Sequence, residues 1–190
     1  MVENTLSVSE QVKILRMEKG MSIEDLAEKS GISQSNLEKI ERQELSPSLG
    51  VIVSLATILQ VSVGEFFGDA GESPFCIVRS DNRTSISRFS PSYSYEALGL
   101  QKKNRQMEPF LVTLHPTEAH KVEANQHIGE EFIFVLEGKV EVSLLDHHDI
   151  LNKGDSIYYD SNVPHIIKCH DDKPATLLAV IYAKEEMIIL

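Results

Sequence analysis

Residues 26–33 read Leu-Ala-Glu-Lys-Ser-Gly-Ile-Ser, and this stretch predicts two short helices joined by a tight turn. Before it, Ser22 precedes an apolar-periodic segment with acidic residues in its first turn, a pattern typical of a helix start. Gly31 can adopt the left-handed conformation that ends many helices at little cost. Ser33 then offers an N-cap to the following helix. The stretch therefore predicts a helix-turn-helix.

Helical spacing continues on both sides of this stretch. Val8, Val12 and Leu15 recur at helical intervals before it. After Pro47, a helix starting near Ser48 is expected to bury an apolar stripe. A short turn ending at Phe66-Phe67 completes the segment, so we expect five short helices within residues 1–68.

The segment 6–67 resembles the lambda-repressor/Cro type of helix-turn-helix domain. The resemblance rests on the quoted stretch together with further apolar, capping and charged positions: Leu37, Ile40-Glu41-Arg42, Pro47-Ser48-Leu49, Leu55, Leu59 and Val61-Ser62-Val63. Gln43 departs from the family, which commonly has Gly there. The resemblance also implies that Arg16 and Glu41 pair across the domain.

The resemblance places the third helix in the DNA major groove, with its first residues on base edges. The matching base-contact positions are Gln34, Ser35 and Lys39, with Asn36 nearby. Gln can bond adenine through two hydrogen bonds and Lys can donate to guanine. The expected phosphate contacts are Ser22, Ser33 and Arg42, supported by backbone N–H groups at helix starts. The alternative is that these residues form only a solvated polar surface.

Charge and hydropathy limit the possible partners. The 190-residue chain has a net charge of −11, and its first 70 residues carry six basic and eleven acidic side chains. A broad basic field is therefore excluded, and we expect a homodimer to supply useful DNA affinity. No apolar run approaches the roughly 20 residues that cross a bilayer, and no secretion signal is seen. We expect a cytoplasmic protein without membrane association.

From Phe75 onward the pattern changes to short apolar strands separated by turns. The expected strands begin near Phe110, Phe132, Val140, Ile157, His165 and Thr176, and residues 146–149 are expected to form a polar hairpin tip. The composition shifts at Gly68–Pro74. We therefore predict an α+β two-domain chain, with a helical domain over 1–68, a linker over 69–73 and an all-β domain over 74–190.

The β segment resembles a cupin, a small jelly-roll barrel. The resemblance rests on three stretches: His127 to Gly138, Gly154-Asp155-Ser156 and Pro164-His165. Cupins commonly hold a metal with His, His, Glu and a later His. Here the matching metal ligands are His127, Glu131 and His165, and Asn125 stands at the first His position. The odd numbering of residues 125, 127 and 131 would place them on one face of a regular strand.

Such a His/Glu/His set suits iron, and it could also hold zinc or manganese. The alternative is a polar effector pocket without metal, lined by Asn125, His127, Glu131 and His165. Tyr93 and Tyr95 should lie on one face of a strand, because side chains alternate along it. The resemblance implies that such a tyrosine pair lies at the mouth of the effector pocket. The alternative is that both rings only pack against the domain.

The leading hypothesis is a dimeric, sequence-specific transcriptional regulator, not an enzyme, whose cupin domain senses a small-molecule effector. The first alternative is a mononuclear iron enzyme of the phosphonate-epoxidase type, which shares this domain layout. In that case Tyr93 or Tyr95 would lie beside the substrate. A third alternative is a DNA-tethered structural protein with an empty barrel.

Overall fold

The computed structural model describes residues 7–45, 47–67, 73–85, 92–116 and 124–182. These residues divide into a helical unit and a β unit. The segment Leu100–Arg105 belongs to the helical unit, where the Lys103 N–H donates to the Ser73 carbonyl over 2.7 Å. Most of the predicted linker 69–73 lies outside the described residues, so the domain boundary stays a prediction. None of the helices in the described part of the chain has the length and apolarity needed to cross a membrane.

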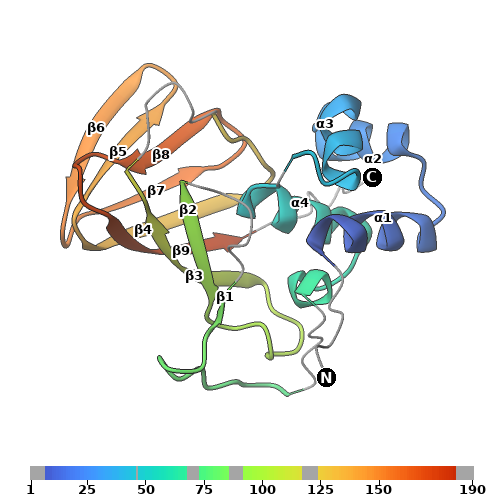
Figure 1. Cartoon of the computed structure of the whole chain (residues 1–190), viewed down its shortest axis with the longest axis horizontal. Helices are drawn as coiled ribbons and strands as arrows, with labels where there is room; N and C mark the ends of the chain where they lie inside the picture. Colours follow the sequence, from blue (N-terminus) through green and yellow to red (C-terminus); the bar gives the residue numbers. More distant parts are fainter. Residues whose placement is uncertain (1–6, 46, 68–72, 86–91, 117–123, 183–190) are drawn as a thin grey trace, which may run out of the picture. The chain divides into compact units, whose positions relative to one another are not determined.

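The helical unit is built from four short α-helices, each started by a serine. The elements, coloured blue to green in Figure 1, are α1 (Val8–Glu18), α2 (Ile23–Ser30), α3 (Gln34–Glu41) and α4 (Leu49–Leu59). The hydroxyl oxygens of Ser7, Ser22, Ser33 and Ser48 each accept a backbone N–H of the first turn. Gly31 ends α2 with φ of 70°. The predicted caps Ser22, Ser33 and Gly31 and the helix start at Ser48 are therefore confirmed, while the Ser7 cap was not predicted. These caps satisfy backbone groups that a helix end leaves unpaired.

The expectation of five α-helices is not confirmed. The fifth predicted element, Val63–Phe67, is a 3-10 helix (η1). Five residues close too few i→i+4 hydrogen bonds to favour an α-helix, and short 3-10 turns are common at such places. Its start is fixed by the Glu65 carboxylate, which accepts the Ser62 N–H over 2.8 Å.

The predicted pair of Arg16 and Glu41 is confirmed and joins α1 to α3. The guanidinium forms a bidentate pair with the carboxylate, with N–O distances of 2.6 and 2.9 Å. Arg16 also donates to the Met21 carbonyl over 2.8 Å. The Arg16 and Glu41 side chains are only 12% and 6% exposed, so the ion pair is largely shielded from water. Through these contacts Arg16 links α1, the loop before α2 and α3.

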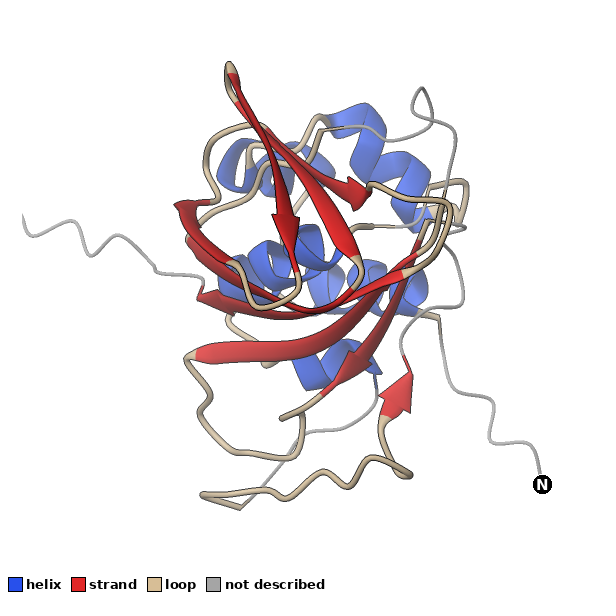
Figure 2. Cartoon of the chain, turned by 90° about the vertical axis from the view of Figure 1, so that its left-hand side faces the viewer, coloured by secondary structure: helices blue, strands red, loops and turns tan. Residues whose placement is uncertain are grey.

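The β unit consists of two antiparallel sheets. The strands are β1 (Thr84–Ser85), β2 (Tyr93–Ala97), β3 (Met107–Leu114), β4 (Glu130–Glu137), β5 (Lys139–Leu144), β6 (His147–Asn152), β7 (Ser156–Asp160), β8 (His165–Cys169) and β9 (Ala175–Tyr182). The large sheet has the order β1-β2-β3-β9-β4-β7, and the small sheet has the order β6-β5-β8. Figure 2 shows the strands in two layers, as expected for a jelly roll.

Alternating side chains fill the space between the two sheets. In the large sheet, Phe110, Ile133, Leu177 and their row neighbours are buried. In the small sheet, Val140 and Val142 are fully buried. Because side chains alternate across a strand, this pattern leaves the even-numbered residues of β4 and β9 on the outer side of the large sheet.

The predicted hairpin tip at residues 146–149 is wrong in extent. His147, His148 and Asp149 belong to β6, and the turn is formed by Leu145-Asp146. Leu145 has φ of 54°, which permits a two-residue connection. Polar residues suggested a loop, but β6 is an edge strand whose residues 147–150 are exposed, where polar side chains are acceptable.

Candidate functional site

The first candidate site is the outer face of α3 in the helical unit. Leu37 and Ile40 are buried and Glu41 faces Arg16 of α1, which leaves the first turn and Lys39 on the outer side of the helix. Gln34, Ser35, Asn36 and Lys39 are all exposed, as are the three expected phosphate contacts Ser22, Ser33 and Arg42. The predicted residues therefore lie on α3 or close to it in sequence, and all of them are accessible.

Acidic side chains bond two of the donors of this face, the Gln34 amide and the Arg42 guanidinium. Nε2 of Gln34 donates to Glu24 Oε1 and to Glu38 Oε1, at 3.1 Å in each case. The other Glu38 oxygen lies 3.4 Å from Nη2 of Arg42. DNA binding would therefore have to replace these contacts, and the two carboxylates would repel phosphate groups. The sequence analysis did not identify Glu24 or Glu38 as partners of Gln34.

Two of the expected phosphate contacts already serve as helix caps. Ser22 accepts the Asp25 N–H over 3.0 Å, while the Ser22 N–H donates to the Asp25 carboxylate over 2.9 Å. Ser33 accepts the Asn36 N–H over 3.3 Å. A hydroxyl can accept from a backbone N–H and still donate its own hydrogen, so both serines remain able to donate to phosphate.

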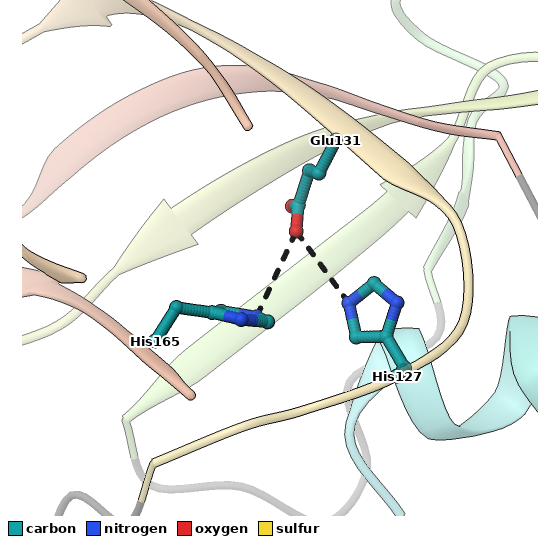
Figure 3. Close-up of side chains that lie close together, drawn as sticks. All are labelled: His127, Glu131 and His165. Carbon is teal, nitrogen blue, oxygen red and sulfur yellow. Dashed lines mark ion pairs between the residues drawn. The ribbon is translucent and has the colours of Figure 1, made fainter. Parts of the chain in front are cut away.

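The second candidate site is a buried cluster inside the β unit, formed by His127, Glu131 and His165. Figure 3 shows the three side chains pointing toward one another. Oε2 of Glu131 lies 3.6 Å from Nε2 of His127 and 3.9 Å from Nε2 of His165. The residues are 5%, 9% and 3% exposed, respectively. The structure thus brings together all three predicted metal ligands.

His165 is held by both its ring and its backbone. Its Nδ1 lies 2.8 Å from the Val163 carbonyl, which can only accept, so Nδ1 carries the proton and Nε2 faces Glu131 with its lone pair. Its backbone exchanges two hydrogen bonds with Asn125, of 2.8 and 2.9 Å. Burial lowers the pKa of His165 below its usual value, so the ring is neutral at neutral pH.

His127 reaches the cluster from a loop and not from a strand. β4 begins only at Glu130, so the strand-alternation argument for residues 125, 127 and 131 is wrong, although its outcome for His127 and Glu131 holds. The loop is fixed by backbone bonds of 2.9 Å from His127 N–H to the Ser161 carbonyl and from Ser161 N–H to the Gly129 carbonyl. Gly129 has φ of 108°, a conformation that favours glycine.

Tyr159 is a member of this cluster that the sequence analysis missed. Its hydroxyl donates to Oε2 of Glu131 over 2.7 Å, and its ring meets that of His165 edge-on, with centroids 5.1 Å apart. Tyr159 lies directly opposite Glu131 on the neighbouring strand β7. Burial, followed by the adjacent Glu131 charge, raises the pKa of Tyr159, which keeps the phenol protonated as a donor.

Tyr93, Tyr95 and Asn125 are the remaining residues predicted to line the pocket. The two tyrosines stack on each other, and Asn125 lies opposite His165 of the cluster. Tyr93 and Tyr95 stack with centroids 6.0 Å apart, which agrees with their placement on one face of β2. The Tyr93 hydroxyl donates to the Ile167 carbonyl over 2.9 Å and so joins β2 to β8. Asn125 opposes His165 in an antiparallel bridge, so both side chains project to the same face.

The donor set is chemically suited to a divalent metal. Two imidazole nitrogens and one carboxylate oxygen are ligands for zinc, iron and manganese. Ligand atoms bound to one ion at about 2.1 Å would lie roughly 3.4 Å apart, and the Glu131 oxygen lies 3.6 and 3.9 Å from the two histidine nitrogens. The proton on Nδ1 of His165 and the Tyr159 hydroxyl supply the outer hydrogen bonds that orient such ligands.

Comparison with known families agrees with this division of the chain. A family model described as Helix-turn-helix matches residues 12–66, and one described as Cupin domain matches residues 110–181. The chain therefore contains a helix-turn-helix domain followed by a cupin domain. The first site thus lies in the helix-turn-helix domain, and the His127–Glu131–His165 cluster lies within the stretch matched as cupin.

Some relatives match this chain over most of its length at low identity. The HTH-type transcriptional regulator PuuR of Escherichia coli (strain K12) is 24% identical over 169 residues, covering 87% of this chain and 89% of the relative. An HTH_3 family transcriptional regulator from Vibrio cholerae has a TM-score of 0.66 at 24% identity, over 94% of this chain and 96% of that structure. This similarity of structure shows the fold.

A solved enzyme structure has the same fold at a lower score. The hydroxypropylphosphonic acid epoxidase from S. wedmorenis has a TM-score of 0.52 and 25% identity, over 92% of this chain and 96% of that structure. The same architecture therefore occurs both in a protein named a regulator and in one named an enzyme, so the function of this chain has to be argued from its own sites.

Proposed function

We propose that this protein is a dimeric, sequence-specific DNA-binding transcriptional regulator, with the domain boundary at residues 69–73. The observation that carries this proposal is the exposed face of α3, where Gln34, Ser35, Asn36 and Lys39 stand free of the domain core. A further support is PuuR, which is named a transcriptional regulator and is similar to this protein along 87% of the chain. Amide and ammonium groups are the donors that read adenine and guanine, and α3 carries both on its accessible side.

The experiment that tests this proposal is selection of DNA fragments by the purified full-length protein. Gln34→Ala combined with Lys39→Ala should lose the selected sequence, because each lost base contact costs about 1–3 kcal/mol of discrimination. Lys13→Ala removes an exposed charge from α1 and serves as the control, which should keep the selected sequence. An unchanged selection by the double variant would refute the assignment of α3.

We further propose that the cupin domain takes a small-molecule effector at the His127–Glu131–His165 cluster, with a divalent metal as the group that the donors fit. The metal would supply a positive centre that attracts an oxygen or nitrogen atom of the effector. The protein orients the three ligands through Val163, Tyr159 and the loop bond to Ser161. An effector shifts DNA affinity only if it binds two states of the dimer unequally.

An iron-dependent enzyme is the second candidate, favoured by the three convergent ligands and by the epoxidase with the same fold. Purified protein should then take up oxygen when ferrous ion and a phosphonate substrate are added. The regulator proposal predicts no such uptake, while fragment selection persists. His165→Ala separates the two, because it removes a ligand and leaves α3 unchanged.

A further inference from the structure

Most hydrogen-bond donors around the His127–Glu131–His165 cluster are already in use. The Tyr159 hydroxyl donates to Glu131, and the Tyr93 hydroxyl donates to a backbone carbonyl of β8. Nδ1 of His165 and Nδ1 of His127 lie 2.8 and 3.4 Å from backbone carbonyls, which can only accept, so Nδ1 carries the proton in each ring. The cluster therefore presents acceptors to anything that enters it.

Asn125 carries donors that are still available. It exchanges two backbone hydrogen bonds with His165, of 2.8 and 2.9 Å, so the two side chains project to the same side. Its amide makes no hydrogen bond to the described part of the chain, and the residue is only half-buried. The Ser161 hydroxyl also has no partner among the described residues, but it is fully buried, so a molecule from solvent cannot reach it. The Asn125 amide is the donor that an entering molecule can meet.

The charge of the site determines the charge of the molecule that fits it. The divalent metal of the proposed function and the Glu131 carboxylate together leave one net positive charge. Burial lowers the pKa of His165 and raises that of Tyr159, and the titratable side chains that add to these shifts are Glu131, His127 and Tyr93. No lysine or arginine of the described residues contributes to either shift. One negative charge is therefore the complement of this site, and a second would be buried without a partner.

We propose that the cupin domain binds a small carboxylate and that Asn125 is the residue that recognises it. A carboxylate has two acceptor oxygens, one for the positive centre of the site and one for an N–H of the Asn125 amide. A phosphonate dianion brings one more negative charge than the site can pair, so the site selects against it. This inference rests on the proposed function, because the positive centre is the metal proposed there.

The test is titration of the full-length, cobalt-loaded protein with sodium acetate, followed by the visible absorption of the bound cobalt and by the melting temperature. Acetate should change the spectrum and raise the melting temperature. Methylphosphonate near pH 8 should bind at least about tenfold more weakly, because its extra charge stays unpaired. Equal or tighter binding of methylphosphonate would overturn the choice of a carboxylate.

Two substitutions of Asn125 should act in different ways. Asn125→Ala should raise the acetate dissociation constant at least about tenfold, because a hydrogen bond to a charged oxygen is lost, and it should weaken cobalt binding less than acetate binding. Asn125→Asp keeps the size of the side chain but cancels the remaining positive charge. It should therefore bind cobalt more tightly than the wild type and lose acetate binding.

The matched control is Asn162→Asp, which adds the same charge at an exposed position whose backbone carbonyl, and not its side chain, accepts from Gln126. It should keep the acetate affinity of the wild type, because water and salt screen an exposed charge. Circular dichroism melts should show all variants folded.

Equal acetate affinity in the wild type and a folded Asn125→Ala variant would overturn the role of Asn125. Bound cobalt that does not respond to acetate would overturn this inference alone. A wild type that binds no cobalt would refute the metal assignment of the proposed function and this inference with it.

Discussion

The hydroxyl of Tyr159 donates to the same Glu131 oxygen that faces both His127 and His165. A carboxylate with two free oxygens can rotate and bind a metal in several ways, whereas one held by a donor keeps a single orientation. Tyr159 is therefore a positioning residue for the cluster.

Tyr159→Phe should lower the affinity of the purified protein for Zn²⁺ or Co²⁺ by about 10–100-fold, as loss of outer hydrogen bonds does in other metal sites. Calorimetric titration measures the affinity. Tyr158→Phe is the control, since the neighbouring Tyr158 is exposed and its hydroxyl bonds to Glu130 instead. Equal affinity in the wild type and Tyr159→Phe would contradict the positioning role.

Glu38→Gln should strengthen DNA binding by roughly three- to fivefold at low salt. Its carboxylate now occupies the Gln34 amide and the Arg42 guanidinium, and a charge near the groove repels each nearby phosphate by about 0.5–1 kcal/mol. Fluorescence anisotropy with a selected fragment measures the change. Glu18→Gln removes the same charge from the end of α1 and should have a smaller effect; similar gains in both variants would point to net charge alone.

Gly138 and Gly154 provide a matched pair for stability. Gly138 has φ of 78°, and an added Cβ would lie 2.9 Å from Ala175 backbone and side-chain atoms. Gly154 has φ of 92° with no atom within 4 Å of such a Cβ. Gly138→Ala should cost about 2–4 kcal/mol of unfolding free energy, because strain and overlap add, and Gly154→Ala about 1 kcal/mol. The free energy of unfolding is measured by denaturant titration of both variants. Equal losses in Gly138→Ala and Gly154→Ala would show that the close approach of the β4–β5 turn to Ala175 of β9 does not matter for stability.

The buried Tyr93 hydroxyl should make the stability of the protein depend on pH in the alkaline range. Burial raises the pKa of Tyr93 to about 12 from the ordinary value of 10.0. The unfolded chain therefore releases this proton first, so stability that is complete below about pH 10 is lost as pH rises toward 12. Between these limits the wild type should lose about 2 kcal/mol more than Tyr93→Phe. Parallel loss in both proteins, referenced to melts near pH 8, would exclude Tyr93 as the source.

The sequence predicted the helical domain well because its signals are local. Each serine cap and Gly31 act on residues within one turn of themselves, so their effect can be read from adjacent positions. Lys39 and Gln34 were placed outward by the same helical spacing. The 3-10 form of η1 could not be predicted in this way, because a five-residue element depends on the surrounding fold.

The cupin site was predictable only where a family pattern supplied its residues. His127, Glu131 and His165 came from that resemblance, while strand alternation assumed a strand that the structure replaces with a loop. Tyr159 joins the cluster through the pairing of β7 with β4, a non-local register that no spacing along the chain reveals.

His127, Glu131 and His165 are anchored in three different places: a loop, the large sheet and the small sheet. A ligand bonded to all three side chains would cross-link the two sheets of the cupin domain. Its arrival should register as a higher melting temperature of the protein, growing with the logarithm of the concentration of the added compound. Measuring the melting temperature of the protein with a series of metals and metabolites can therefore identify the effector without knowledge of the DNA sequence that the protein binds.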